Sequence, residues 1–145
     1  MHIPEDKIIK TTGFAPKCLY CGTKCVLCCA SVVYHGSNKY GYIWICPHCE
    51  EPTYVGAHKT TFAPMGHPAN AALRQLRREV HMLFDPLWNT VEGKKQKKQA
   101  RYNKYKELAQ LMGLPIELTH IAMFSENRCI EVIRLIKEGK FNKEN

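Results

Sequence analysis

The sequence predicts an α+β fold in which a small three-stranded sheet is followed by a lobe of three to four α-helices. Two observations support this prediction. β-Branched and aromatic residues, which favour strands, are concentrated between positions 26 and 57 and are framed by paired cysteines. Beyond position 67, apolar residues recur at steps of three and four, the spacing of a buried helix face. We expect one compact unit made of an N-terminal arm (1–17), the sheet (18–66) and a basic helical lobe (67–145).

Two C-x-x-C pairs, separated by 24 residues, frame the first two strands, and their members are Cys18, Cys21, Cys46 and Cys49. Each pair forms a tight turn that directs two thiolates at one ion, and the strands bring the two turns together. This pattern is typical of a structural Zn²⁺ site. Gly22 supplies a permissive backbone after the first pair, whereas Glu50 stands where a second glycine is more usual. The sequence therefore predicts a zinc ribbon with one structural zinc ion.

The other four cysteines are not expected to bind the metal. Cys25 and Cys28 offer an alternative cluster with the first pair, but they lie in a segment of strand composition. Side chains alternate between faces along a strand, so these two thiols would point in opposite directions. We interpret Cys28, Cys29 and, in a later helix, Cys129 as small core residues.

Disulfides are disfavoured because they need an oxidising compartment. Residues 1–7 include two acids and a proline, and they have no apolar segment like that of a secretory signal. No run reaches the ~18–20 apolar residues of a membrane span. We therefore expect reduced thiols, a cytoplasmic location and no membrane association.

Three strands are predicted, at 26–34, 40–45 and 53–57, with a turn-rich loop at 35–39 and a further extended segment at 7–10. In the second strand Tyr42 and Trp44 share one face, and Ile43 and Ile45 share the other. Such a small sheet cannot bury both faces alone, so we expect one face to pack on the helices. Stacking of the aromatic face on nucleic-acid bases is the alternative.

The first helix is predicted to open at Pro68 and to stop before Asp85 and Pro86. Its apolar stripe consists of Ala72, Leu73, Leu76, Val80 and Leu83, and its basic face of Arg74, Arg77, Arg78 and His81. Asp85 is interpreted as the N-cap of a second helical start.

A basic segment at 94–106 holds seven Lys and Arg residues and no acid, and it continues as a helix to Gly113. Its buried stripe is predicted at Tyr105, Leu108, Ala109 and Met112, which leaves exposed Lys94, Lys97, Lys98, Arg101 and Lys104. The last helix follows the N-cap Ser125 and ends at Gly139, with an inward face of Cys129, Ile130, Ile133 and Ile136.

The formal net charge is +8, and most of it lies in the second half of the chain. Residues 1–58 hold five Lys/Arg and four Asp/Glu, whereas residues 59–145 hold sixteen and nine. Basic residues at the start of a helix oppose its dipole, which favours a role in binding over a merely solvated face. The predicted partner is DNA or RNA. The predicted binding residues are Arg74, Arg77, Arg78, Lys94, Lys95, Lys97, Lys98, Arg101 and Lys104.

Several segments together carry a family resemblance: Cys18–Gly22, Val33–Tyr34, Trp44–Cys49, Val55–Thr61, Leu73–Arg78 with His81, Phe84–Trp88 and His120–Phe124. Over about residues 18–136 the chain resembles the zinc-finger-containing proteins of unknown function found in bacteriophages and prophages. The resemblance implies that the paired cysteines at 18, 21, 46 and 49 are the zinc ligands and that Cys25, Cys28 and Cys29 lie outside the motif. It also implies a phage or prophage origin and work in the cytoplasm of a host bacterium.

Three classes of function follow. The favoured one is a non-catalytic accessory protein that binds nucleic acid. The second is a factor that binds and modulates a host protein machine, with the basic face meeting an acidic partner. The third is a metal-dependent nuclease that uses His58, His81, Asp85 or His120; it is disfavoured because the sequence has no H-x-x-x-H pair and no clustered carboxylates.

Overall fold

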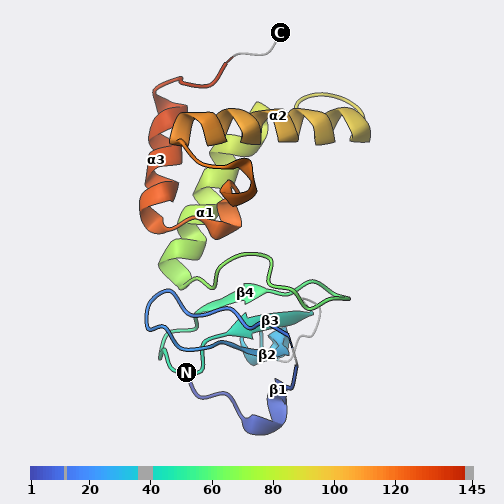
Figure 1. Ribbon diagram of the computed structural model, residues 1–145, viewed down its shortest axis with the longest axis vertical. Coiled ribbons are helices and arrows are strands. Elements are labelled where there is room, and N and C mark those ends of the chain that lie inside the picture. Colours follow the sequence, from blue (N-terminus) through green and yellow to red (C-terminus); the bar gives the residue numbers. More distant parts are fainter. Residues whose placement is uncertain (12, 36–40, 143–145) are drawn as a thin grey trace. The chain divides into compact units, whose positions relative to one another are not determined.

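The computed structural model describes residues 1–11, 13–35 and 41–142, and Figure 1 shows its helices and strands. The chain forms two compact units, Met1–Arg74 and Gln75–Asn145. The first holds the sheet and the paired cysteines, and the second holds most of the helical structure.

The first unit contains a four-stranded antiparallel sheet in the order β1-β2-β3-β4. The strands are β1 Ile8–Ile9, β2 Val26–Cys29, β3 Tyr42–Ile45 and β4 Tyr54–Gly56. The last three correspond to the predicted ribbon, and the extended segment of the arm adds β1 as an edge strand, so the sheet has one strand more than expected. β2 is shorter than predicted because a 3-10 turn at Ala30–Val32 follows it. The part of the predicted hairpin at 36–40 lies outside the described residues.

The two faces of the sheet carry separate apolar clusters, as the alternation in β3 predicts. Trp44 lies in one cluster with Leu27, Val55 and the buried Cys18, Cys25 and Cys46. Ile43 and Ile45 lie in the other with Cys28, Ala30 and Tyr54. Segments of the first unit itself pack on both faces: Ile9 and Phe62 on the first, and Ile3, Val32 and Val33 on the second. The packing of the sheet on the helical lobe stays a prediction.

The described residues contain three α-helices, α1 Ala71–Phe84, α2 Lys94–Met112 and α3 Glu126–Lys137, with 3-10 turns at Asp85–Leu87, Ile116–Leu118 and Ile121–Met123. α1 begins after Asn70 instead of at Pro68, because Asn70 Oδ1 accepts a hydrogen bond from Leu73 N at 2.9 Å. The predicted C-terminal end of α2 and the predicted start of α3 are confirmed. Gly113 adopts the left-handed conformation (φ 68°) after α2, and Ser125 Oγ accepts from Arg128 N at the start of α3.

The core of the second unit is built around Phe84, whose ring packs edge-on against Tyr105 with 4.8 Å between ring centres. α3 buries Cys129, Val132 and Leu135, whereas Ile130 is 55% exposed, so its predicted inward face was wrong in part. The helix carries apolar residues on two neighbouring stripes, and periodicity alone could not decide which stripe faces the core.

Two cations that were predicted to be exposed are buried. Arg77 donates through Nε and Nη2 to the carbonyl oxygen of Phe124, at 3.2 and 2.9 Å. Lys104 is 2% exposed, and its Nζ donates to Glu107 Oε2 at 3.1 Å and to the Asn142 carbonyl at 2.7 Å. Both long side chains bury an apolar stem and satisfy their charged ends with internal oxygens.

We expect Glu107→Ala to lower the free energy of unfolding by about 3 kcal/mol, because it leaves the buried Lys104 ammonium without its carboxylate. Urea unfolding followed by the helical circular dichroism signal would measure this. The matched control is Glu117→Ala, at an exposed position, with an expected change within about 0.5 kcal/mol. The double variant Lys104→Met with Glu107→Leu should recover most of the loss. Equal stability of Glu107→Ala and Glu117→Ala would contradict a stabilising ion pair.

Candidate metal centre and cationic surface

The four cysteines of the C-x-x-C pairs converge on one point. All four Sγ atoms of Cys18, Cys21, Cys46 and Cys49 lie within 4.8 Å of one another. The separation is 3.7 Å between Cys18 and Cys49, 3.5 Å between Cys21 and Cys46, and 3.7 Å between Cys21 and Cys49. A tetrahedral zinc ion with sulfur at about 2.3 Å places neighbouring sulfurs about 3.8 Å apart. The donor set and its spacing therefore fit Zn²⁺.

The first metal turn is a tight hairpin held by backbone hydrogen bonds. Gly22 N donates to Cys18 O at 2.9 Å, and Cys18 N donates to Thr23 O at 2.9 Å. Gly22 adopts φ 77°, a left-handed conformation that glycine enters without strain. The two thiolates are thereby presented on the same side of the turn.

The second metal turn follows directly from β3. Cys46 N donates to Thr53 O at 2.9 Å, and the Cys49 amide donates to Cys46 Sγ at 3.4 Å. Glu50 does not have a positive φ, so this turn does not need the glycine that its sequence lacks. The departure from the usual pattern has a simple conformational explanation.

The four thiols differ in exposure. Cys18 and Cys46 are buried, Cys49 is half-buried and Cys21 is exposed. The Thr23 hydroxyl, 3.1 Å from Cys21 Sγ, lowers the pKa of the Cys21 thiol to about 6, whereas burial is the main cause that raises the pKa of Cys18. Four sulfur ligands fill a tetrahedral coordination sphere and leave no position for a reactive water. The zinc ion is accordingly structural.

Three of the remaining cysteines, Cys25, Cys28 and Cys129, are buried thiols, as predicted for Cys28 and Cys129. Cys25 lies in the cluster on one face of the sheet and Cys28 in the cluster on the other, so the alternative ligand set does not form. Burial raises the pKa of Cys25 to about 12 and those of Cys28 and Cys129 to about 11. Cys29 is only half-buried. None of the eight cysteines, all of which lie in the described part of the chain, forms a disulfide.

The arginines of α1 do not form the single exposed face that was predicted. Arg74 donates to the Pro52 carbonyl at 3.2 Å and lies over the Tyr54 ring, 4.1 Å from its centre. Arg77 is buried, as described above. Arg78 remains exposed and donates to Gln75 Oε1 at 2.6 Å. Structural contacts within each unit therefore occupy two of the three guanidinium groups.

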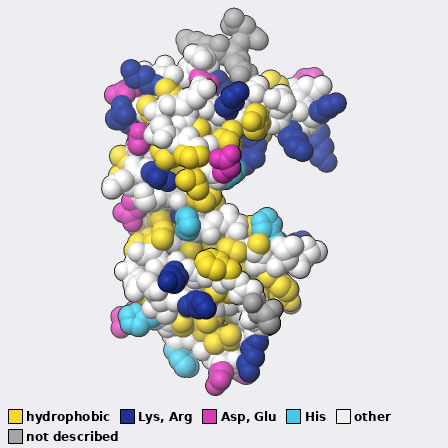
Figure 2. Space-filling view, in the orientation of Figure 1, with side chains coloured by type: hydrophobic (Ala, Val, Ile, Leu, Met, Phe, Trp, Pro, Cys, Tyr) yellow, Lys and Arg dark blue, Asp and Glu magenta, His cyan; other side chains and the backbone are white. Residues whose placement is uncertain are grey.

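The first half of α2 carries an exposed cationic face, defined here as Lys94, Lys95, Lys97, Lys98 and Arg101. This half runs beyond α1 and α3, and Lys and Arg side chains gather around it (Figures 1 and 2). Steps of four and three connect Lys94, Lys98 and Arg101 with Tyr105, Leu108 and Met112, so all six lie on one stripe. The stripe is cationic where the helix projects and apolar where it meets the core.

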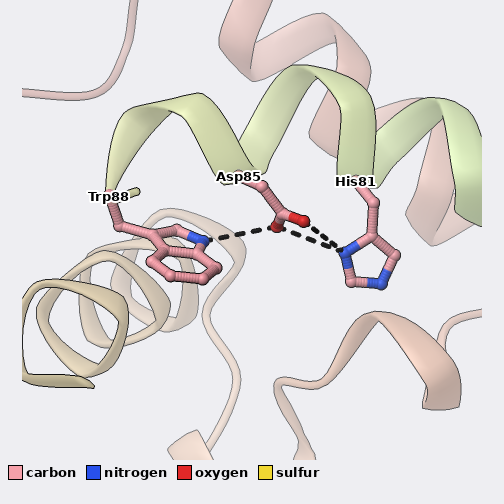
Figure 3. A network of polar contacts seen from close by, with 3 residues as sticks. All are labelled: His81, Asp85 and Trp88. Atoms are coloured by element: carbon pink, nitrogen blue, oxygen red, sulfur yellow. Dashed lines mark hydrogen bonds and ion pairs between the residues drawn. The ribbon is translucent and has the colours of Figure 1, made fainter. Parts of the chain in front are cut away.

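A polar network links α1 to the 3-10 turn that follows it (Figure 3). The Asp85 carboxylate lies 3.2 and 3.3 Å from His81 Nδ1 and accepts a hydrogen bond from Trp88 Nε1 at 3.3 Å. The interpretation of Asp85 as an N-cap was wrong, because its oxygens bond side chains, and α2 begins only after Gly93. A His–Asp pair four residues apart is the sequence signal that could have indicated this contact.

Neither His58 nor His120 belongs to a cluster of three or more metal-ligating side chains among the described residues. His120 is exposed and its ring centre lies 5.9 Å from that of Tyr105, while the exposed His58 belongs to the first unit. Within the described part of the chain, the cysteine tetrad is the one cluster of three or more metal-ligating side chains. Among the described residues, no helix has both the length and the apolar character that crossing a bilayer requires.

Comparison with protein families shows that the model of the DUF3268 family, described as a zinc-finger-containing domain, matches residues 15–139. The matched range includes both C-x-x-C pairs and all three α-helices. Searches of curated proteins and of solved structures returned no match.

We expect Cys46→Ser to abolish stoichiometric zinc binding and to unfold the first unit, because the metal holds its two turns together. Metal analysis by mass spectrometry and near-ultraviolet circular dichroism of Trp44 would measure both effects. Cys28→Ser is the matched control: the same exchange at a cysteine that is 0% exposed but not a ligand should retain one zinc per chain. Full zinc content in Cys46→Ser would contradict the assignment.

Proposed function

The chain belongs to this family of zinc-finger-containing domains, and from that premise we propose that it is a non-catalytic nucleic-acid-binding protein. One structural zinc ion, held by the four cysteines, stabilises the first unit. The cationic face of α2 in the second unit binds the phosphates of DNA or RNA. The observation that carries the proposal is the placement of the cationic face on an exposed, projecting part of α2.

The cost of this arrangement supports a binding role. Lys94 and Lys98, and likewise Lys97 and Arg101, are like charges four residues apart, and each such pair destabilises a helix by about 0.2–0.5 kcal/mol. Cations in the first turn also oppose the helix dipole, and no side chain caps this end of α2. Phosphates would remove the repulsion and supply the anion that a helix N-terminus favours. Solubility alone does not require so many positive charges on one helix face.

The chemistry of the cysteines supports a cytoplasmic location. Coordination of zinc by four thiolates needs reduced cysteines, which a reducing compartment maintains. We propose that the protein acts in the cytoplasm of a bacterium as an accessory factor of phage or prophage origin. The same cationic face would suit an acidic protein, and the binding experiment below separates the two partners.

We expect the affinity for nucleic acid to fall steeply with salt, with a log–log slope of about −0.9 for each duplex phosphate neutralised. Five contacts would cost a factor of roughly 500 between about 50 and 200 mM salt. Exchange of Lys94, Lys97, Lys98 and Arg101 for Gln should weaken binding to every sequence about equally and flatten the slope by about 3 to 4. Fluorescence anisotropy over a salt series measures both quantities.

The matched control removes the same charge from exposed lysines elsewhere, by exchange of Lys7, Lys10, Lys106 and Lys137 for Gln. This variant should keep most of the affinity and nearly the whole slope. Equal losses in both quadruple variants would show a general charge effect and contradict a specific face. Absence of binding at about 50 mM salt would favour an acidic protein partner, and cleavage of the labelled strand would contradict a non-catalytic role.

A further inference from the structure

A group of aromatic and polar side chains lies next to Arg101, at the C-terminal end of the cationic face of α2. The guanidinium carbon of Arg101, the last cation of the stripe, lies 5.9 Å from the centre of the Trp88 ring and 4.9 Å from that of Tyr105. Tyr105 is 5% exposed and belongs to the core, whereas Trp88 is half-buried. Arg101 thus connects a row of phosphate-binding charges to an accessible indole.

Asp85 fixes the orientation of that indole. Its carboxylate can only accept, so Trp88 Nε1 and His81 Nδ1 both donate to it (Figure 3). The hydrogen bond removes the need of the indole N–H for solvent and holds the ring in one position. The second ring nitrogen of His81 points away from Asp85, where it can bond an external group. The cluster therefore offers a held aromatic ring, a guanidinium plane and one outward-facing imidazole nitrogen.

We infer that this cluster is a binding site for an unpaired base, and that the nucleic acid bound by this protein is single-stranded. The inference rests on the proposed function and specifies its substrate class. Bases in a duplex cover each other's faces, whereas a single strand offers a base to an indole or a guanidinium plane. Along α2 the charges from Lys94 to Arg101 span about 10 Å, so phosphates on the stripe place a following base at Trp88.

The cations near Trp88 distinguish it from a tryptophan with a purely structural role. Trp44, the other tryptophan, is 3% exposed and lies in the core of the first unit with no cation described over its ring. Trp88 instead lies next to the end of a row of cations that make no internal ion pair among the described contacts. A base stacked on Trp88 would have its own phosphate within reach of Arg101 and the stripe.

Trp88 also gives a direct optical signal. We expect an oligonucleotide of about 12 bases to quench the tryptophan fluorescence and to protect from acrylamide the accessible tryptophan, which is Trp88 because Trp44 is buried, whereas the duplex of the same sequence does neither. Trp88→Leu should weaken binding of the single strand by about 5- to 100-fold, the loss of one base-stacking contact, and change duplex binding by less than about twofold. Trp88→Phe, which keeps an aromatic face, should retain most of the single-strand affinity.

The measurements separate failure of this inference from failure of the proposed function. Equal affinity for single strand and duplex, with salt dependence intact and no protection of Trp88 from acrylamide, would overturn only the inferred binding site for an unpaired base. Loss of all nucleic-acid binding would overturn both. Acrylamide protection is measured on the unaltered protein, so the test stands even if Trp88→Leu fails to fold. Parallel series with deoxythymidine and uridine oligonucleotides distinguish DNA from RNA as the source of the base.

Discussion

The convergence of four thiolates on one zinc ion is the constraint on which the structure of the first unit depends. Its sheet has strands of only two to four residues, and such short strands are marginal without a further support. The two metal turns precede β2 and follow β3, so one ion joins the two strands at the open end of the central hairpin. Cys18, Cys25 and Cys46 also line the apolar cluster around Trp44, which joins the metal site to the core. Coordination and packing therefore support the same few strands.

The second unit is stabilised differently, since its described residues include no cluster of three or more metal-ligating side chains. Its core rests on aromatic packing between Phe84 and Tyr105 and on two buried cations whose charges are satisfied by oxygen atoms far along the chain. α2 contributes to this core mainly with its second half, which holds four of its five buried residues, whereas Ala100 is the buried residue of its first half. One stripe of this helix therefore has two roles. Tyr105, Leu108 and Met112 pack on the core, and Lys94, Lys98 and Arg101 present positive charge.

Local chemistry was the part that the sequence made predictable. The metal ligands follow from two short spacings, the faces of β3 from simple alternation, and the end of α2 from Gly113. Long-range partners were not predictable. Arg77 and Lys104 bond to carbonyl oxygens 47 and 38 residues away, and no pattern in a single sequence indicates such a pair. Asp85 before a proline resembles a helix cap, so its side-chain contacts with His81 and Trp88 were missed.

The projecting half of α2 has a consequence for how it would meet a ligand. From Lys94 to Gln99 every side chain is exposed, so local opening of these turns breaks backbone hydrogen bonds without removing apolar contacts. Such segments belong to the low-stability end of a protein, with fast amide hydrogen exchange. The spacing of their charges can then adjust to the irregular backbone of a polyanion. Recognition of this kind becomes tolerant of sequence, and part of its free energy is spent on ordering the helix.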